Sequence, residues 1–145
     1  TVLDCCTKKV DGYAMAEHMR TELVVDALKM AIINGHTRHG ETIFHSDRGT
    51  QYMSAEFAEF TRDAGIVRSV GRTGICYDNA WAESFNATLK VERVHRTVYP
   101  TRRHAIGDIA RYIELRYNQR RLHSALQYRT PNEAEQDWYA TNKAA

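Results

Sequence analysis

The 145-residue sequence contains no apolar run near the roughly 18–20 residues that a membrane-spanning helix needs. Its first residues lack the basic start, apolar stretch and small-residue cleavage site of a secretory signal. Neither glycine-rich phosphate-binding pattern, G-x-x-x-x-G-K or G-x-G-x-x-G, occurs. We therefore expect no membrane segment, a cytoplasmic location and no nucleotide-binding loop.

Cysteine is also scarce. The three cysteines are an odd number, and Cys5 and Cys6 are adjacent, which suits neither a disulfide framework nor a zinc site; the third is Cys76. The seven histidines show neither zinc-finger nor zinc-protease spacing. We interpret the cysteines as reduced thiols that behave as small buried hydrophobic side chains.

Negative charge is scarce in one region. Between Lys90 and Arg129 there are ten Lys or Arg residues and three acids, a local balance of +7, although the whole chain carries only +2. A one-sided basic region is expected of a protein that binds a phosphate backbone. The alternative interpretation is a solvated basic helix face without a partner.

The overall composition is that of a globular protein. The chain is 43% hydrophobic and 26% charged, and its length suits one domain that can bury a core. It opens on TVLD without an initiator Met, so we expect it to be a fragment of a longer protein.

Hydrophobic spacing predicts strands that alternate with helices, which favours an α/β fold. Strands are expected over TVLD, VDGYAM, ETIF (41–44) and IVRSV (66–70). Helices are expected over 20–34, 55–64 (capped by Ser54 and stopped by Gly65), 80–94 (capped by Asp78 or Asn79) and about 103–121, with a short one after Pro131. The predicted core stripes of the third and fourth helices are Trp81, Phe85, Leu89 and Val91, and Ile106, Ile109, Ala110, Ile113 and Tyr117.

Two stretches each carry one carboxylate among small and polar residues. HSDRGTQY (45–52) contains Asp47, and YDNAWAESF (77–85) contains Glu83, with 35 residues between the two acids. Asp47 follows a predicted strand, where open sheets place function, and Glu83 lies near the start of a predicted helix. Clustered carboxylates bind Mg²⁺, and two such ions about 3.5–4 Å apart can clamp the attacking and leaving oxygens of a phosphodiester. On spacing alone, two ordinary surface acids remain the alternative.

Several side chains could hold DNA beside these acids. Lys90 lies seven residues after Glu83, two helical turns along on the same face. The other candidate DNA-binding residues are Arg72, Tyr77, Asn79, Arg93, Arg120 and Arg121. For Tyr77 and Asn79 the alternative is capping and loop packing, and for the two adjacent arginines it is a helix end packed against the core. His45, Ser46 and Asp47 do not indicate a hydrolase triad, because neighbours on one strand point apart.

Four motifs in order, HSDRGTQY, SAEF, CYDNAWAESFNATLKVE and YNQRRLHSALQYRTP, resemble the catalytic core of bacterial insertion-sequence transposases of the retroviral integrase (rve) superfamily. The resemblance implies an RNase H-like three-layer fold, with a central mixed sheet flanked by helices, over residues 1–125 and a C-terminal tail over 126–145. It implies a DDE triad in which Asp47 is the second acid and Glu83 the third. It also implies Mg²⁺ or Mn²⁺ as cofactor, DNA (element ends and target) as partner, and a homo-oligomer.

The sequence departs from the family pattern at its start. The family's first Asp lies on a strand upstream of the opening hairpin, and no such stretch precedes TVLD; Asp4 matches a different acid and is only a minor candidate ligand. We therefore expect the first strand to be missing. Two alternatives stay open: a catalytically silent DNA-binding or self-associating fragment, and a metal-dependent nuclease of the RNase H superfamily.

Overall fold

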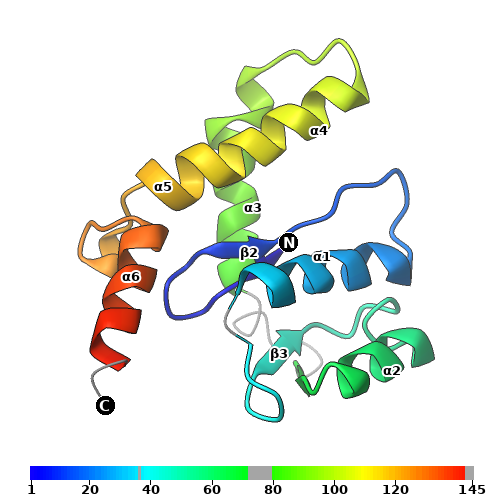
Figure 1. Ribbon diagram of the computed structural model, residues 1–145. Helices are drawn as coiled ribbons and strands as arrows, with labels where there is room; N and C mark the ends of the chain where they lie inside the picture. Colours follow the sequence, from blue (N-terminus) through cyan, green and yellow to red (C-terminus); the bar gives the residue numbers. More distant parts are fainter. Residues whose placement is uncertain (36, 72–79, 143–145) are drawn as a thin grey trace. The chain divides into compact units, whose positions relative to one another are not determined.

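The computed structural model describes residues 1–35, 37–71 and 80–142 (Figure 1). Its elements are β1 (Val2–Leu3), β2 (Val10–Gly12), α1 (Thr21–Asn34), β3 (Ile43–Ser46), α2 (Ala55–Asp63), β4 (Val67–Val70), α3 (Ala80–Glu92), η2 (Val94–Arg96), α4 (Arg102–Arg111), η3 (Tyr112–Tyr117), α5 (Asn118–Arg120), η4 (Ser124–Leu126) and α6 (Pro131–Asn142). The chain divides into two compact units, one of Thr1–Val2 with Asp11–Glu83 and one of Leu3–Val10 with Ser84–Ala145. In the ranges that the structure describes, every helix is too short or too polar to cross a membrane.

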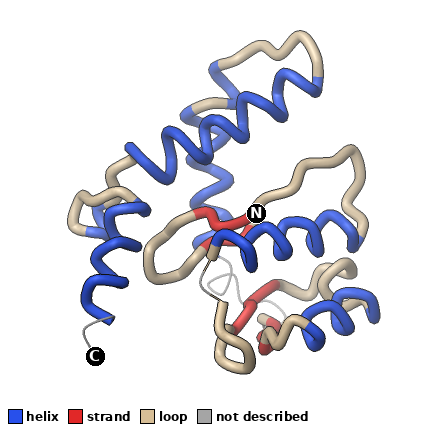
Figure 2. The backbone as a smooth tube through the Cα atoms, in the orientation of Figure 1, coloured by secondary structure: helices blue, strands red, loops and turns tan. Residues whose placement is uncertain are grey.

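The strands are short and pair in twos (Figure 2). β1 pairs with β2, while β3 pairs with β4 in parallel, from Ile43 opposite Val67 to Ser46 opposite Val70. β3 begins two residues later than ETIF predicts, because the preceding residues form a turn in which the Glu41 and Thr42 amides both donate to the Arg38 carbonyl.

The first unit is built around α1 and α2. Its buried cluster consists of Val25, Leu28, Ala31 and Phe57, with Phe44 and Tyr52 packed against it. Local signals set the helix boundaries as predicted. The Ser54 hydroxyl accepts a hydrogen bond from the Phe57 amide at 3.1 Å, and Gly65 follows α2 with a φ of +68°, a conformation that glycine adopts without strain.

In the same unit, β2 lies very close to α1 at Gly12. A Cβ atom at this position would lie 2.1 Å from the Ala27 carbonyl oxygen and 2.6 Å from the Ala31 nitrogen. Both are backbone atoms of α1 and cannot move aside. Glycine is therefore required here for the close approach and not for its backbone freedom.

The second unit contains a nearly continuous helical run from Arg102 to Arg120, in place of the regular helix predicted there. Its middle, η3, is a π-helix: the Asn118 amide donates to the Ile113 carbonyl, and the Arg121 amide donates to the Arg116 carbonyl at 2.8 Å. The ring of Phe85 on α3 meets that of Tyr117 edge-on at 4.8 Å between centroids.

The buried apolar stripes that were predicted for α3 and for the Arg102–Arg120 run are partly wrong. Phe85, Ile113 and Tyr117 are buried, but Trp81, Val91 and Ile106 are 48%, 56% and 43% exposed. These three side chains lie on α3 and near the start of the Arg102–Arg120 run, outside the π-helix, whereas the predicted residues within η3, Ile113 and Tyr117, are buried. Periodicity along a helix marks an apolar face but does not tell how much of that face another element covers. On α3, only the face that carries Phe85 is buried among the described side chains.

The interpretation of the cysteines as buried is wrong for the two that are described. Cys5 and Cys6 are free and exposed. They lie in the turn between β1 and β2, which the Asp4 carboxylate closes by accepting hydrogen bonds from the Cys6 and Thr7 amides and from the Thr7 hydroxyl at 2.6–2.9 Å. The hydrogen bonds of Asp4 hold the turn together, so both thiols can lie at the surface, and the role that the structure shows for Asp4 is structural.

Candidate active site

Asp47 is the first residue after β3, as predicted, and is exposed. Its Oδ1 accepts a hydrogen bond from the Gly49 amide at 2.8 Å, which fixes the carboxylate relative to the turn that follows. The strand end is tied to its neighbour, because the Gly71 amide donates to the Ser46 carbonyl at 2.9 Å and Arg48 Nε donates to the Gly71 carbonyl at 3.2 Å. The HSDRG segment therefore holds Asp47 at a defined corner of the sheet.

An aromatic cluster of Phe44, Tyr52 and Phe57 packs next to the strand end that carries Asp47. The Tyr52 ring lies 6.1 Å from Phe44 and 5.7 Å from Phe57, measured between centroids. Arg68 on β4 donates to the Tyr52 carbonyl at 2.5 Å and lies 5.6 Å from the Phe57 ring. Burial, helped by the negative charge of Asp47, raises the pKa of Tyr52. The last residue of HSDRGTQY thus anchors the loop that begins at Asp47.

Glu83 lies in the first turn of α3 and is exposed, a position at which the helix dipole favours a negative charge. Lys90, in the last turn, is also exposed. Three predicted DNA-binding residues, Arg72, Tyr77 and Asn79, lie outside the described residues, and so do the predicted caps of α3. Their roles remain predictions.

The donor chemistry of Asp47 and Glu83 fits a hard divalent cation, because both offer carboxylate oxygens at exposed positions and Mg²⁺ binds through one or two carboxylates while keeping several waters. Over residues 1–35, 37–71 and 80–142, no three or more His, Cys, Asp or Glu side chains gather so as to hold a metal ion. That Asp47 and Glu83 hold a metal ion together therefore stays a prediction.

The basic segment from Lys90 to Arg129 is not uniformly available to a partner. Arg93 forms a two-pronged ion pair with Asp108, in which Nε donates to Oδ2 at 2.6 Å, and the Tyr99 hydroxyl donates to the same oxygen at 2.7 Å. The hydrogen bonds from Arg93 hold the pKa of Asp108 below its ordinary value. The Arg93 guanidinium thus joins the start of η2 to α4, while its side chain stays 44% exposed.

A second network involves Glu92, at the end of α3. Its two oxygens accept hydrogen bonds from the Tyr112 hydroxyl at 2.7 Å and from Arg121 Nε at 2.9 Å. Burial opposes the charge of Glu92, but these two hydrogen bonds outweigh it and hold the pKa of Glu92 below its ordinary value. Burial and the bond to Glu92 raise the pKa of Tyr112. Arg121 thus has a structural partner, whereas its neighbour Arg120 is exposed.

The YNQRR segment contains a third contact that sequence reasoning missed. Asn118 is buried, and its side chain donates to the Val10 carbonyl and accepts from the Val10 amide, both at 3.0 Å. The Asn118 side chain thus satisfies both backbone groups of Val10, as the backbone of a neighbouring strand would. A polar asparagine in the middle of a helix is the one local signal that could have indicated this role, because asparagine is a weak helix former.

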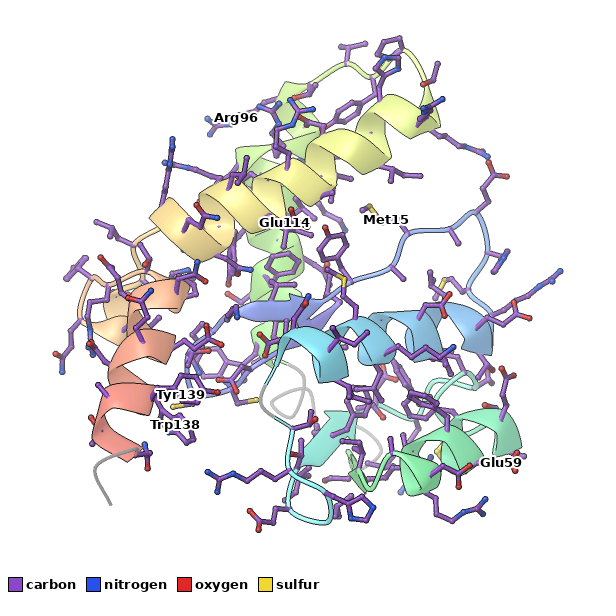
Figure 3. The ribbon with its side chains drawn as sticks, viewed as in Figure 1. Met15, Glu59, Arg96, Glu114, Trp138 and Tyr139 are labelled. Atoms are coloured by element: carbon purple, nitrogen blue, oxygen red, sulfur yellow. The ribbon has the colours of Figure 1, made fainter. Side chains whose placement is uncertain are left out.

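The exposed cations that remain are candidates for phosphate contact. Arg96 donates to the Val91 carbonyl at 2.8 Å and extends outward from η2 (Figure 3). The other exposed basic residues of this segment are Lys90, Arg102, Arg103, Arg111, Arg116 and Arg120. Two of the three acids between Lys90 and Arg129, Glu92 and Asp108, bind Arg121 and Arg93.

Comparisons with known proteins show the family of the chain. Two models described as "Integrase core domain" match the chain, one over residues 1–76 and the other over 64–131. The transposase for insertion sequence element IS904 of Lactococcus lactis is 38% identical over 92% of this chain and 52% of its own length. The transposase for IS629 of Shigella sonnei is 34% identical over 97% of this chain and 46% of its own length. The chain thus spans about half the length of these curated relatives.

Among solved structures, the catalytic core domain of BIV integrase is similar, with a TM-score of 0.59 and 16% sequence identity over 88% of this chain and 78% of that one. This likeness shows an RNase H-like α/β fold. This confirms the predicted fold class. The chain belongs to the integrase core domain family, and its curated relatives are insertion-sequence transposases, as its motifs predicted.

Proposed function

We propose that this chain supplies the catalytic core for metal-dependent cleavage and transfer of DNA strands during transposition. The observation that carries the proposal is Asp47, which lies directly after a parallel strand, is exposed, and is held by the Gly49 amide. Its family and its insertion-sequence relatives support DNA as the substrate. The further parts of the proposal are a cytoplasmic bacterial location and self-association on the DNA.

In this proposal Asp47 and Glu83 hold Mg²⁺ or Mn²⁺. When bound, the ions supply Lewis-acid stabilisation and an activated water or DNA 3′-OH as nucleophile. The backbone orients the carboxylates: the Gly49 amide donates to Asp47, and Glu83 is carried on the first turn of α3. The exposed cations of the segment Lys90 to Arg129 position the phosphate backbone, and no covalent protein–DNA intermediate is required.

The test is Mn²⁺-dependent nicking and joining of a labelled duplex that carries the element's end. It uses the longer transposase beside this chain, with Asp47→Asn and Glu83→Gln in each. We expect both substitutions to abolish joined product while leaving DNA binding within about twofold. Matched controls are Glu59→Gln and Asp63→Asn, since both acids are exposed on α2 (Figure 3 labels Glu59) and should not affect activity. Normal joining by either active-site variant would refute the proposal.

A second candidate is a DNA-binding module without turnover. It is favoured by the exposed cations of the segment Lys90 to Arg129, which could hold a phosphate backbone whether or not a reaction follows. In the same assay, this function gives DNA binding by the 145-residue chain without nicked or joined product, while the longer transposase reacts. A metal-dependent nuclease, the third possibility, would give nicked product that is never joined.

A further inference from the structure

The loop between α5 and α6 (orange in Figure 1) contains an unusual backbone conformation. Gln127 and Tyr128 are consecutive and both have positive φ angles, 57° and 59°. Left-handed conformations are unfavourable for residues with a Cβ, and adjacent ones without glycine are rare. A tyrosine at such a position indicates that the surrounding structure forces the conformation.

The residues on both sides of the turn show how it is forced. The Tyr128 amide donates to the His123 carbonyl at 2.9 Å, and the His123 amide donates to the Arg129 carbonyl at 3.1 Å. Leu126 is buried beneath the turn. Immediately after it, Thr130 and Glu133 form a reciprocal capping box, with the Thr130 amide donating to Glu133 Oε2 at 2.8 Å. The turn is fixed at both ends, so its strain cannot relax.

The strained turn buries Leu126 but leaves its own aromatic ring outside the core. The Tyr128 side chain is 72% exposed, in contrast to Tyr112 and Tyr117 of the same unit, which are buried. Strained backbone clusters at active and ligand-binding sites, where it presents a side chain in a fixed orientation. The feature that this turn presents is a flat aromatic ring.

The sequence on the N-terminal side of the ring is basic. Tyr128 lies near the end of the segment Lys90 to Arg129, whose net charge along the sequence is +7, and its neighbour Arg129 pairs with Asp137 of α6. An exposed aromatic ring in a cationic segment is the combination that single-stranded nucleic acid binds, because bases stack on the ring while the cations hold the phosphates. We propose that Tyr128 is a base-stacking residue, to which the strained turn presents an unpaired base of the DNA strand. This inference rests on the proposed function, in which DNA is the substrate.

The experiment measures the affinity of the 145-residue chain for a fluorescent single-stranded oligonucleotide and for a duplex of equal length. Tyr128→Ala should weaken single-strand binding roughly 5- to 150-fold, the range for loss of base–aromatic stacking, and should change duplex binding little. Tyr128→Phe keeps the ring and should bind as the original chain does. Trp138→Ala is the matched control, since Trp138 is a partly exposed aromatic on α6.

Two further measurements separate binding from folding. Tyr128→Gly relieves the strain at the positive φ, so its melting temperature should be unchanged or higher while its affinity falls as in the alanine variant. Because no charge is removed, the salt dependence of binding should keep its slope, whereas Arg120→Gln should reduce that slope by about one phosphate contact.

Unchanged single-strand affinity in Tyr128→Ala would overturn the inference. So would a loss of self-association in sedimentation with DNA binding intact, because the ring would then contact a second copy of the chain. Either result leaves the proposed function standing if the chain still binds DNA. A complete lack of DNA binding by the unsubstituted chain would overturn the proposed function itself.

Discussion

Replacing Asn118 by alanine tests whether the YNQRR segment is structural. The Asn118 side chain makes two hydrogen bonds of 3.0 Å to the Val10 backbone, and both residues are buried, at 7% and 3% exposure. Alanine would leave the Val10 amide and carbonyl without these partners. A buried polar group left unpaired costs about 1–3 kcal/mol, so the expected loss for the two groups is about 2–6 kcal/mol. For a domain whose total stability is about 5–15 kcal/mol, this is a large fraction.

Urea denaturation followed by circular dichroism measures the loss as a shift in midpoint at constant slope. The matched control is Asn34→Ala. Asn34 also donates to a β2 carbonyl, that of Asp11, but through one exposed bond of 3.2 Å, so its loss should cost below about 1 kcal/mol. Asn118→Asp should be at least as destabilising at neutral pH, because a carboxylate cannot donate to the Val10 carbonyl. A midpoint for Asn118→Ala equal to that of the control would refute the reasoning.

Three further predictions follow from the contacts described. Gly12→Ala should destabilise the first unit by about 1–3 kcal/mol or more in the same urea assay, because its Cβ would meet α1 backbone at 2.1 Å. Burial, reinforced by the positive charge of Arg121, lowers the pKa of His123 below its ordinary value of 6.5. The contribution of neutral His123 to the free energy of unfolding should therefore be fully present above pH 6.5 and be lost as the pH falls towards the lowered pKa. His123→Phe should remove this part of the pH profile. Arg121→Gln should lower the melting temperature because it unpairs Glu92, whereas Arg120→Gln should weaken DNA binding without changing the melting temperature.

Each of the three has an outcome that contradicts it. An unchanged urea midpoint in Gly12→Ala would mean that β2 moves away from α1 at little cost. A pH profile that is identical with and without the His123 imidazole would mean that other groups control acid stability. A loss of DNA binding in Arg121→Gln at unchanged melting temperature would restore the original prediction that this arginine contacts phosphate.

The parts of the fold that the sequence predicted are those set by local signals. Ser54 and Gly65 delimit α2 because capping and left-handed backbone depend on one or two neighbouring residues. Asp47 was predicted at a strand end because a β-prone run meets small polar residues there, and that position is confirmed. Its role in catalysis remains a prediction, as does the role of Glu83.

The parts that sequence reasoning missed depend on partners distant in the chain. Asn118 bonds a residue 108 positions away, and Arg121 pairs with Glu92 on a different helix. The YNQRR motif alone does not show these partners, so phosphate contact by its arginines and packing against the core could not be told apart from the sequence. The exposure of Cys5 and Cys6 was missed because composition alone treats cysteine as a buried residue, whereas the Asp4 turn places them at the surface.

The π-helix η3 makes the second unit sensitive to the number of residues it contains as well as to their identity. A π turn accommodates one residue more than an α turn, so it takes up an extra residue without changing the direction in which the following side chains point. If η3 became a regular α-helix with all its residues kept, everything that follows would rotate by about 100°, and Asn118 would leave the Val10 backbone while Arg121 would leave Glu92. Deleting one residue between Tyr112 and Tyr117 would instead allow a regular helix that keeps both contacts, whereas inserting one more residue there would separate both contacts at once.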